Sequence, residues 1–135
     1  MYQQMIFVNL ATDDVETSKK FFTELGYTIN PQFSTDDCAC VVISDTIIAM
    51  LLSKQHYATF TKKEIADSTR TSEVLICLSA ESREKVDELV GKAVAAGGSA
   101  GELTQDLGFM YGRSFDDLDG HTWEVVWMDP AAVQG

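Results

Sequence analysis

The chain has 135 residues, of which 45% are hydrophobic and only two are proline, so we expect one folded domain with a hydrophobic core and exclude a disordered chain. Its formal net charge of -11 repels polyanions, so we expect no nucleic-acid or membrane partner, and the charge favours cationic ligands. The three cysteines do not make a disulfide framework, and the start of the chain lacks the features of a signal peptide, so we expect a cytoplasmic protein with reduced thiols.

The N-terminal part of the chain predicts a strand, a helix and three further strands. Residues 5–11 alternate as a strand, and Asp13 with Glu16 has the spacing of a capping box for a helix that ends at Gly26. After Gly26 the hydrophobic period changes to two over the short runs YTINPQF, CACVVIS and TIIAMLL. Pro31 indicates that the first of these runs is an edge strand. The predicted order is therefore β-α-β-β-β.

Residues 53–72 show no strand alternation. Thr61 and Glu64 stand at a second capping-box spacing, so this segment is predicted to be a short helical linker.

The β-α-β-β-β order then repeats. EVLICLS predicts a strand, Ser82 predicts the cap of a helix, and Gly97 with Gly98 predicts the end of that helix. A short strand at 99–103, a loop, and the strands FMYGRSF and HTWEVVWM follow.

Internal duplication is the main architectural prediction. The fold class is α+β, with two tandem β-α-β-β-β modules in residues 4–52 and 73–128 of a single domain that spans residues 1–135.

The last hairpin carries the most informative acidic residue. Asp119-Gly120 is a strong hairpin signal because glycine accepts a positive φ without steric cost. In the strand that follows, alternation places Trp123 and Trp127 on a face that we expect helices to cover, and Glu124 on the opposite face. Burial of an unpaired carboxylate is costly, so Glu124 is expected to be exposed, paired or bound to a cation.

Two stretches resemble the vicinal-oxygen-chelate superfamily of glyoxalases, bleomycin-resistance proteins and extradiol dioxygenases. VNLATDDVETSKKFFTELGY, with Asp14, Ser18 and a pair of aromatic residues, resembles the opening of a module in that superfamily. DDLDGHTWEVV resembles its D-P-D-G-x-x-x-E hairpin, with Leu118 where proline usually stands. The resemblance covers nearly the whole chain and implies half-barrel sheets in a homodimer, where modules from two chains close each cleft. A two-fold dimer is also the commonest soluble oligomer.

The resemblance further implies four metal-ligand positions, one on the first and one on the last strand of each module. In this chain they are Phe7, Met50, Glu73 and Glu124. Phenylalanine and methionine do not bind hard cations, so we expect no cofactor, or at most a weakly bound divalent metal at Glu73 and Glu124. His121 is expected to be a turn or surface residue rather than a ligand.

Four other residues invite a functional interpretation. Cys38 and Cys40 share one strand face, and we interpret them as core residues rather than metal ligands. Tyr111 and Arg113 are predicted to reach the ligand cleft, and the alternative for Arg113 is an ion pair with a surface acid.

Two functions fit these observations, and we favour the first. It is a metal-free homodimer whose cleft binds a small organic ligand, and the net charge favours a cation. Glu73 and Glu124 are the predicted anionic anchors. The predicted lining residues are Met5, Phe7, Met50, Leu52, Tyr111 and Arg113. The second is a glyoxalase I-like lyase or related dioxygenase-like enzyme, with Glu124 as catalytic base or ligand and Glu73 as its partner. The missing ligands of the first module and the acidic surface argue against the lyase. A third reading is a degenerate domain kept for protein partnership.

Overall fold

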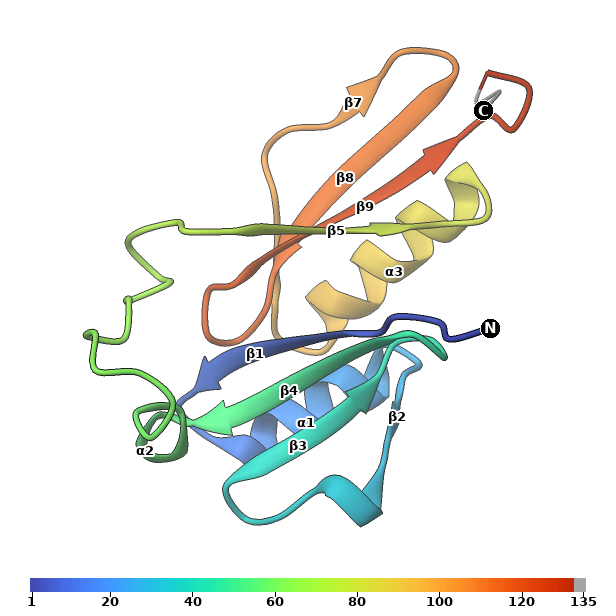
Figure 1. Ribbon diagram of the computed structural model, residues 1–135. Helices are drawn as coiled ribbons and strands as arrows, with labels where there is room; N and C mark the ends of the chain where they lie inside the picture. Colours follow the sequence, from blue (N-terminus) through green and yellow to red (C-terminus); the bar gives the residue numbers. More distant parts are fainter. Residues whose placement is uncertain (133–135) are drawn as a thin grey trace. The chain divides into compact units, whose positions relative to one another are not determined.

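The computed structural model describes residues 1–132 of the chain (Figure 1). The chain forms two compact units, one that ends at Asp67 and one that begins at Ser68, here called unit 1 and unit 2. Their boundary falls within the segment predicted as a linker. No helix among the described residues has both the length and the apolar composition needed to cross a membrane.

Unit 1 combines a four-stranded sheet with one main helix. Its elements are β1 (Ile6–Thr12), α1 (Val15–Glu24), β2 (Thr28–Ile29), the 3-10 helix η1 (Pro31–Phe33), β3 (Cys38–Val42), β4 (Ile47–Ser53) and α2 (Lys54–Tyr57). The strand order is β1-β4-β3-β2, with β1 parallel to β4 and the other neighbours antiparallel. The short strand β2 lies at an edge of the sheet, and the proline that predicted this edge begins η1 instead of continuing the strand.

The start of α1 differs by one residue from the prediction. The N-cap is Asp14 rather than Asp13, because Asp14 has an extended backbone and its carboxylate accepts a hydrogen bond from the Thr17 N–H at 3.1 Å. The hydroxyls of Thr12 and Ser18, both buried, lie 2.6 Å apart in a hydrogen bond that ties the end of β1 to the helix. Asp14 and Ser18, which are two of the residues that carry the family resemblance, therefore have structural roles in this chain.

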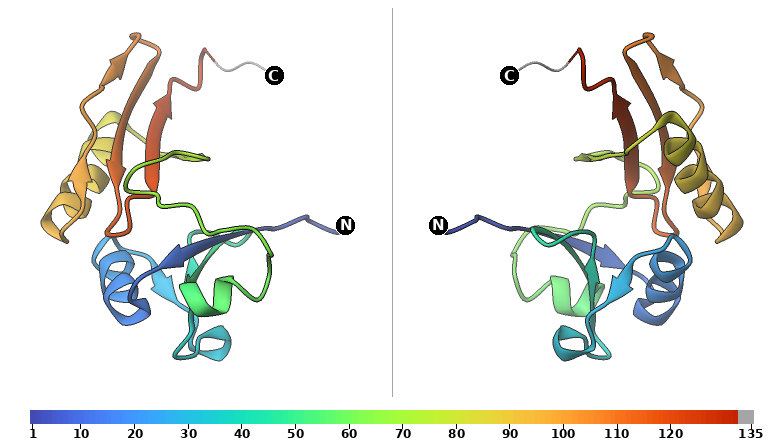
Figure 2. Two further views of the ribbon diagram at one scale, coloured as in Figure 1. Left: turned by 90° about the vertical axis from the view of Figure 1, so that its left-hand side faces the viewer. Right: turned by 90° about the vertical axis from the view of Figure 1, so that its right-hand side faces the viewer.

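Helix α1 packs against one face of the unit 1 sheet (Figure 2). Phe21 and Phe22 are 1% and 2% exposed, and their rings meet edge to face with centroids 5.1 Å apart. The strand residues that share this layer are almost completely buried, and they are Ala39, Val41, Ala49 and Leu51. Burial of each large side chain contributes roughly 1.5–3 kcal/mol. The opposite face, turned away from α1, is called the far face of unit 1.

The second capping-box prediction was wrong. Helix α2 is capped by Ser53, whose hydroxyl accepts from the His56 N–H at 3.1 Å, and residues 58–72 contain no helix. Thr61 accepts a hydrogen bond from the N–H of Lys63, two residues away, which closes a local turn instead of opening a helix.

Unit 2 repeats the arrangement of unit 1. Its elements are β5 (Leu75–Ser79), α3 (Arg83–Ala95), β6 (Ser99–Ala100), β7 (Gln105–Asp106), β8 (Met110–Asp116) and β9 (Thr122–Met128). The strand order is β5-β9-β8-β6, β5 is parallel to β9, and β7, which lies in a predicted loop, pairs with β8. The predicted α+β class with duplicated β-α-β-β-β modules is confirmed.

The core of unit 2 lies between α3 and one face of its sheet. The stacked rings of Phe115 and Trp123, with centroids 6.4 Å apart, and the buried Val125 fill the sheet side of this core. Val86 and Val90 fill the helix side and are 0% and 1% exposed. The opposite face, turned away from α3, is called the far face of unit 2.

Candidate functional site

The carboxylate of Glu124 lies on the far face of unit 2. Its neighbours along β9, Trp123 and Val125, are 2% and 0% exposed and point into the α3 core, so strand alternation turns Glu124 the other way. The cross-strand partners of Glu124 are Cys77 on β5 and Ser114 on β8. Directly paired residues point to the same side of a sheet, so a carboxylate, a thiol and a hydroxyl form one rung, here called the Glu124 rung.

The surroundings of Glu124 leave its carboxylate available. The residue is partly buried, and the described residues provide it with no hydrogen bond or ion pair. Partial burial, and then the negative charge of Glu124, raise the pKa of Cys77. The Cys77 thiol therefore stays protonated at neutral pH, where it offers a weak neutral donor rather than a nucleophile.

Glu73, the second predicted acid, lies outside the strand on which it was expected. Pairing between β5 and β9 begins at Leu75 with Thr122, the first residue of β9. The predicted strand was too long at this end, because β9 offers no earlier partner beyond the hairpin turn. Glu73 is exposed and precedes the sheet by two residues.

Comparison of the two sheets by register assigns the equivalent strand positions. Phe7 on β1 pairs with the residue two before Met50, and Leu75 on β5 pairs with the residue two before Glu124. The position that corresponds to Phe7 in unit 2 is therefore that of Leu75. By register, Glu124 is the acid among these four strand positions.

The far face of unit 1 is mostly apolar and contains sulfur. Met50 pairs with Asn9 on one side and with Cys40 on the other, and Leu52 lies two residues further along the same face. Phe7 shares this face and is 55% exposed. The buried cysteines of β3 carry no disulfide and belong to this layer, in line with their interpretation as packing residues. Predicted lining residue Met5 lies just before β1 and is exposed.

Tyr111 and Arg113 lie on the opposite face of unit 2 from Glu124. The hydroxyl of Tyr111 donates to the Asp87 carboxylate of α3 at 2.7 Å, and Arg113 donates to the same oxygen at 3.0 Å. The hydrogen bond from Tyr111, followed by that from Arg113, holds the pKa of Asp87 below its usual range. The ion-pair alternative for Arg113 is the arrangement found, and we leave Tyr111 and Arg113 out of the site that contains Glu124.

The hairpin before β9 contains a group of potential metal ligands. Ligand atoms of Asp117, Asp119 and His121 all lie within 4.8 Å of one another, so their spacing could hold a metal ion. Asp117 is 7% exposed, and its Oδ1 accepts from the backbone N–H groups of Asp119 and His121 while Oδ2 accepts from the indole N–H of Trp123, each at 3.0 Å. Burial raises the pKa of Asp117, while His121 and the three N–H donors oppose that rise. Both carboxylate oxygens are thus already used to organise the hairpin.

The structural importance of Asp117 was missed in the sequence, although part of its signal was visible. An aspartate that bonds the amides two and four residues later in a D-x-D-G turn follows the behaviour of Asx turns. No local sequence pattern predicts the hydrogen bond from Trp123 to Asp117, because this bond depends on how the turn folds back onto β9.

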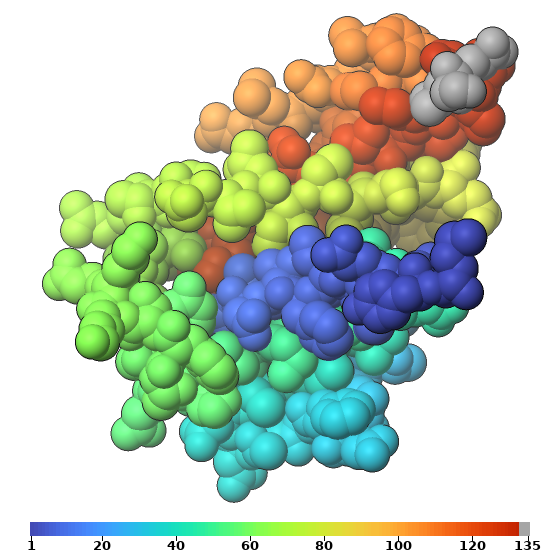
Figure 3. All heavy atoms as spheres, viewed as in Figure 1, coloured from blue at the N-terminus to red at the C-terminus, as the bar shows by residue number. Residues whose placement is uncertain are grey.

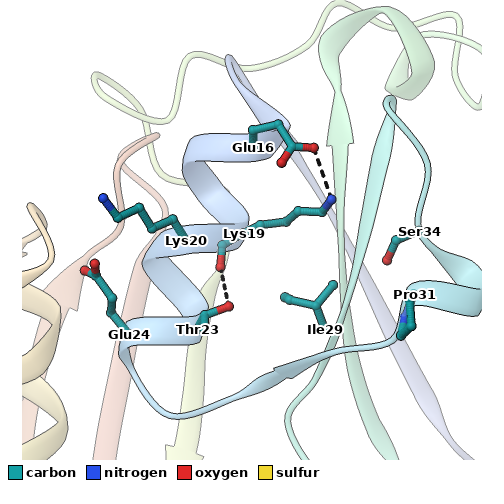
Figure 4. Close-up of a pocket in the computed structure, with 8 residues that line it drawn as sticks. All are labelled: Glu16, Lys19, Lys20, Thr23, Glu24, Ile29, Pro31 and Ser34. Carbon is teal, nitrogen blue, oxygen red and sulfur yellow. Dashed lines mark hydrogen bonds and ion pairs between the residues drawn. The ribbon is translucent and has the colours of Figure 1, made fainter.

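A shallow groove of about 710 Å³ lies beside α1 in unit 1 (Figure 4). Lys19 in this groove pairs with Glu16 at 3.1 Å, and Thr23 donates to the Lys19 carbonyl oxygen at 2.8 Å. The groove is formed by the outer side of the helix with Ile29 and Pro31, not by the far face of the sheet. Lys19 and Thr23 are engaged within α1, and we do not assign the groove a ligand.

Comparison with known proteins places the fold and the family. Residues 4–44 match the family model described as bleomycin resistance protein-like N-terminal. A hypothetical protein from S. aureus is similar in structure, with 32% sequence identity, a TM-score of 0.77, and coverage of 94% of this chain and 95% of that chain. No match was found among curated proteins.

Two further solved structures share the fold at lower identity. A glyoxalase/bleomycin resistance protein/dioxygenase family enzyme from Burkholderia phytofirmans PsJN has 16% identity and a TM-score of 0.76, covering 93% of this chain and 99% of that chain. A glyoxalase-related enzyme from Fulvimarina pelagi has 21% identity and a TM-score of 0.74, covering 93% and 88%. The chain belongs to the glyoxalase/bleomycin resistance/dioxygenase superfamily.

The metal site that this superfamily implies does not fit the strand positions of this chain. An aromatic ring at Phe7, a thioether at Met50 and a hydrocarbon at Leu75 supply no oxygen or nitrogen donor, so Glu124 would be left with water as its co-ligand. One carboxylate does not offset the hydration of a divalent ion at low concentration.

Proposed function

We propose that this protein binds a small organic cation without a metal, and that Glu124 is its anionic anchor. The observation that carries the proposal is the Glu124 rung, where a partly buried carboxylate without a protein partner among the described residues lies between uncharged Cys77 and Ser114. A carboxylate in such surroundings favours a cation that can also donate hydrogen bonds.

The charge of the whole chain supports this choice of ligand. A net charge of -11 concentrates cations near the surface and repels anions such as glutathione adducts. A hydrogen bond to a charged group contributes about 1.5–3 kcal/mol. The anchor alone therefore gives modest affinity, and an apolar part of the ligand must supply the remainder.

The other predicted contact residues lie in unit 1, on the far face of its sheet or just before it. We propose that Phe7 and Met50, with Met5 just before β1, offer contacts to hydrocarbon or aromatic groups, whereas Leu52 is 2% exposed and packs within this layer. Methionine suits this role because its flexible, polarisable side chain adapts to differently shaped ligands. Glu73 remains a predicted second anchor at the entry to β5.

A set of fluorescent probes that differ in charge tests the proposal. Proflavine is a cation with amino N–H donors, Nile red is neutral and anilinonaphthalene sulfonate is an anion. We expect the protein to prefer the cation, and Glu124→Gln to weaken its binding by roughly tenfold or more, since 1.4 kcal/mol corresponds to a factor of ten. Binding of the neutral probe should change little.

Glu84→Gln is the matched control for this experiment. It removes the same charge from an exposed position on α3, on the other side of the unit 2 sheet. If Glu84→Gln and Glu124→Gln weakened cation binding equally, the effect would come from net charge alone. That result would contradict the role of Glu124 as the anchor. Equal loss of cationic and neutral probes in Glu124→Gln would do the same.

The lyase alternative assigns Glu124 a different role. In that reading Glu124 is the base that moves a proton beside a carbonyl, with Glu73 as its partner. Turnover of the hemithioacetal of methylglyoxal and glutathione, measured with and without added Ni²⁺ or Zn²⁺, separates the two functions. We expect no turnover, and metal-stimulated turnover that is lost in Glu124→Gln would put the lyase first.

We also propose that the chain forms a homodimer. Its support is the exposed apolar surface of the edge strands β1 and β5, where Ile6, Phe7 and Leu75 are 55%, 55% and 56% exposed. The N-terminal residues, blue in Figure 3, contribute to the visible surface and carry no charged side chain up to Thr12. Light scattering at micromolar concentration should give twice the mass of the chain, and a monomer would contradict this proposal.

A further inference from the structure

The buried carboxylate of Asp117 joins the hairpin turn to the first residues of β9. It accepts three hydrogen bonds of 3.0 Å, from the backbone N–H groups of Asp119 and His121 and from the indole N–H of Trp123. We propose that Asp117 is a positioning residue, which holds β9 in the register that presents the Glu124 carboxylate on the far face of unit 2. The role of Glu124 itself rests on the proposed function above.

Register decides whether the anchor is available. Trp123 and Glu124 are consecutive on β9 and therefore point to opposite faces. A slip of one residue would turn Glu124 into the α3 core and Trp123 onto the far face. The bond from Trp123 to Asp117 pins the indole to the buried side of the hairpin, so the next residue must face the other way.

Other contacts of the hairpin favour the same register, including the backbone ladder between β8 and β9. The stacked ring of Phe115 favours the same arrangement, but its centroid is 6.4 Å from that of Trp123, and ring stacking tolerates sliding. A hydrogen bond weakens steeply as its angle and length depart from the optimum. Asp116 accepts one further hydrogen bond, from the Thr122 hydroxyl at 2.7 Å, at the turn end of β8 and β9. Asp117, which holds both turn amides and the indole, constrains the turn and the strand together.

A disulfide trap measures the position of residue 124 without any ligand. Cys77 is paired with Glu124 in neighbouring strands, and such strands lie about 4.8 Å apart, within the range that a disulfide can bridge. In Glu124→Cys, oxidation by diamide should join the introduced thiol to Cys77, and peptide mapping by mass spectrometry quantifies the yield. Adding Cys77→Ser should abolish this cross-link.

Substitutions of Asp117 and Trp123 then test whether the hydrogen bonds of Asp117 affect the yield of this cross-link. We expect Asp117→Ala to reduce the cross-link several-fold in the Glu124→Cys protein. Asp117→Asn should reduce it as well, because the amide can accept from the turn but one of its two atoms sets a donor against the Trp123 N–H. Trp123→Phe, which removes only the indole donor and retains the ring, provides a third variant if Asp117→Ala does not fold.

The matched control is Val90→Ala in the Glu124→Cys protein. Val90 is a buried residue of α3, so its truncation lowers stability while it leaves the hydrogen bonds of Asp117 in place. A positioning role predicts a preserved cross-link in Val90→Ala and a reduced one in folded Asp117 or Trp123 variants. Unchanged yields in Asp117→Asn and Trp123→Phe would overturn the inference. Because no ligand is present, the outcome is independent of whether cationic probes bind.

Discussion

Glu124 on β9 and Cys77 on β5 lie directly opposite each other in neighbouring parallel strands of unit 2. The pair combines an exposed free thiol with a partly buried carboxylate. Partial burial, and then the charge of Glu124, raise the pKa of the Cys77 thiol. The pH at which the Cys77 thiol reacts can therefore be used to detect the charge of Glu124.

This pairing predicts the reactivity of Cys77. In Glu124→Gln one of the two causes of the raised pKa is removed, so the pH at which Cys77 becomes half reactive toward Ellman's reagent should move down. The native-state rate, measured over a range of pH, checks this. Cys38 and Cys40 are buried and should react only on unfolding. An identical pH profile in the two proteins would show that the carboxylate does not act on Cys77.

The hairpin turn requires glycine at position 120. Gly120 has φ of +85°, and an added Cβ would lie 2.8 Å from the Ser68 carbonyl oxygen and 2.9 Å from Thr69 Cα. Gly120→Ala should lower the free energy of unfolding by more than about 1 kcal/mol. Gly91→Ala is the control, because its Cβ meets nothing within 4 Å and the residue lies inside α3.

The control should change stability in the opposite direction. Alanine replaces glycine in a helix interior with a gain of roughly 0.5–1 kcal/mol. Urea unfolding measures both variants. A Gly120→Ala protein as stable as the parent would contradict the backbone geometry of the turn.

Much of the fold could be predicted because its signals are local. Apolar periodicity identified the duplicated strands, and Ser82 accepts from the Lys85 N–H at 3.1 Å as the predicted cap of α3. The errors occurred where two local patterns compete. Adjacent aspartates left the cap of α1 ambiguous between Asp13 and Asp14, and Thr61 matched a capping box that forms a turn instead.

The face of the sheet on which Glu124 lies could be predicted because strand parity is unambiguous there. Flanking Trp123 and Val125 fixed the face of Glu124, because large apolar side chains on a strand mark its buried side. No such contrast marks Tyr111 and Arg113, so the helix partner that they bind was not visible in the sequence. That partner is 24 and 26 residues away, on α3.

The Asp87 interaction predicts a pH dependence of stability. Its folded pKa is lowered by Tyr111 and then Arg113, so the stabilisation is present above the unfolded value of about 3.9 and is lost as pH falls through the folded pKa. Asp87→Asn should lower the melting temperature at pH near 7, by a small amount because the Asp87 side chain is 52% exposed. The difference from the parent should shrink as pH falls below about 4.

Calorimetric melts across this pH range measure the effect. Asp36→Asn, an exposed acid in unit 1, is the control for a simple change of net charge. A difference between Asp87→Asn and the parent that grows on acidification would have the wrong sign for a lowered pKa.

The most direct test of the central claim compares organic cations with metals on the same chelator-dialysed protein. Calorimetric melts are recorded with hydrogen-bond-donating organic cations of increasing apolar size, from methylammonium to proflavine, and in parallel with Mn²⁺, Ni²⁺ and Zn²⁺. Binding to the folded state raises the melting temperature. We predict a rise with the larger organic cations that Glu124→Gln reduces, and no comparable rise with low micromolar metal. A rise of several degrees with low micromolar metal, lost in Glu124→Gln and absent with every organic cation, would contradict the account.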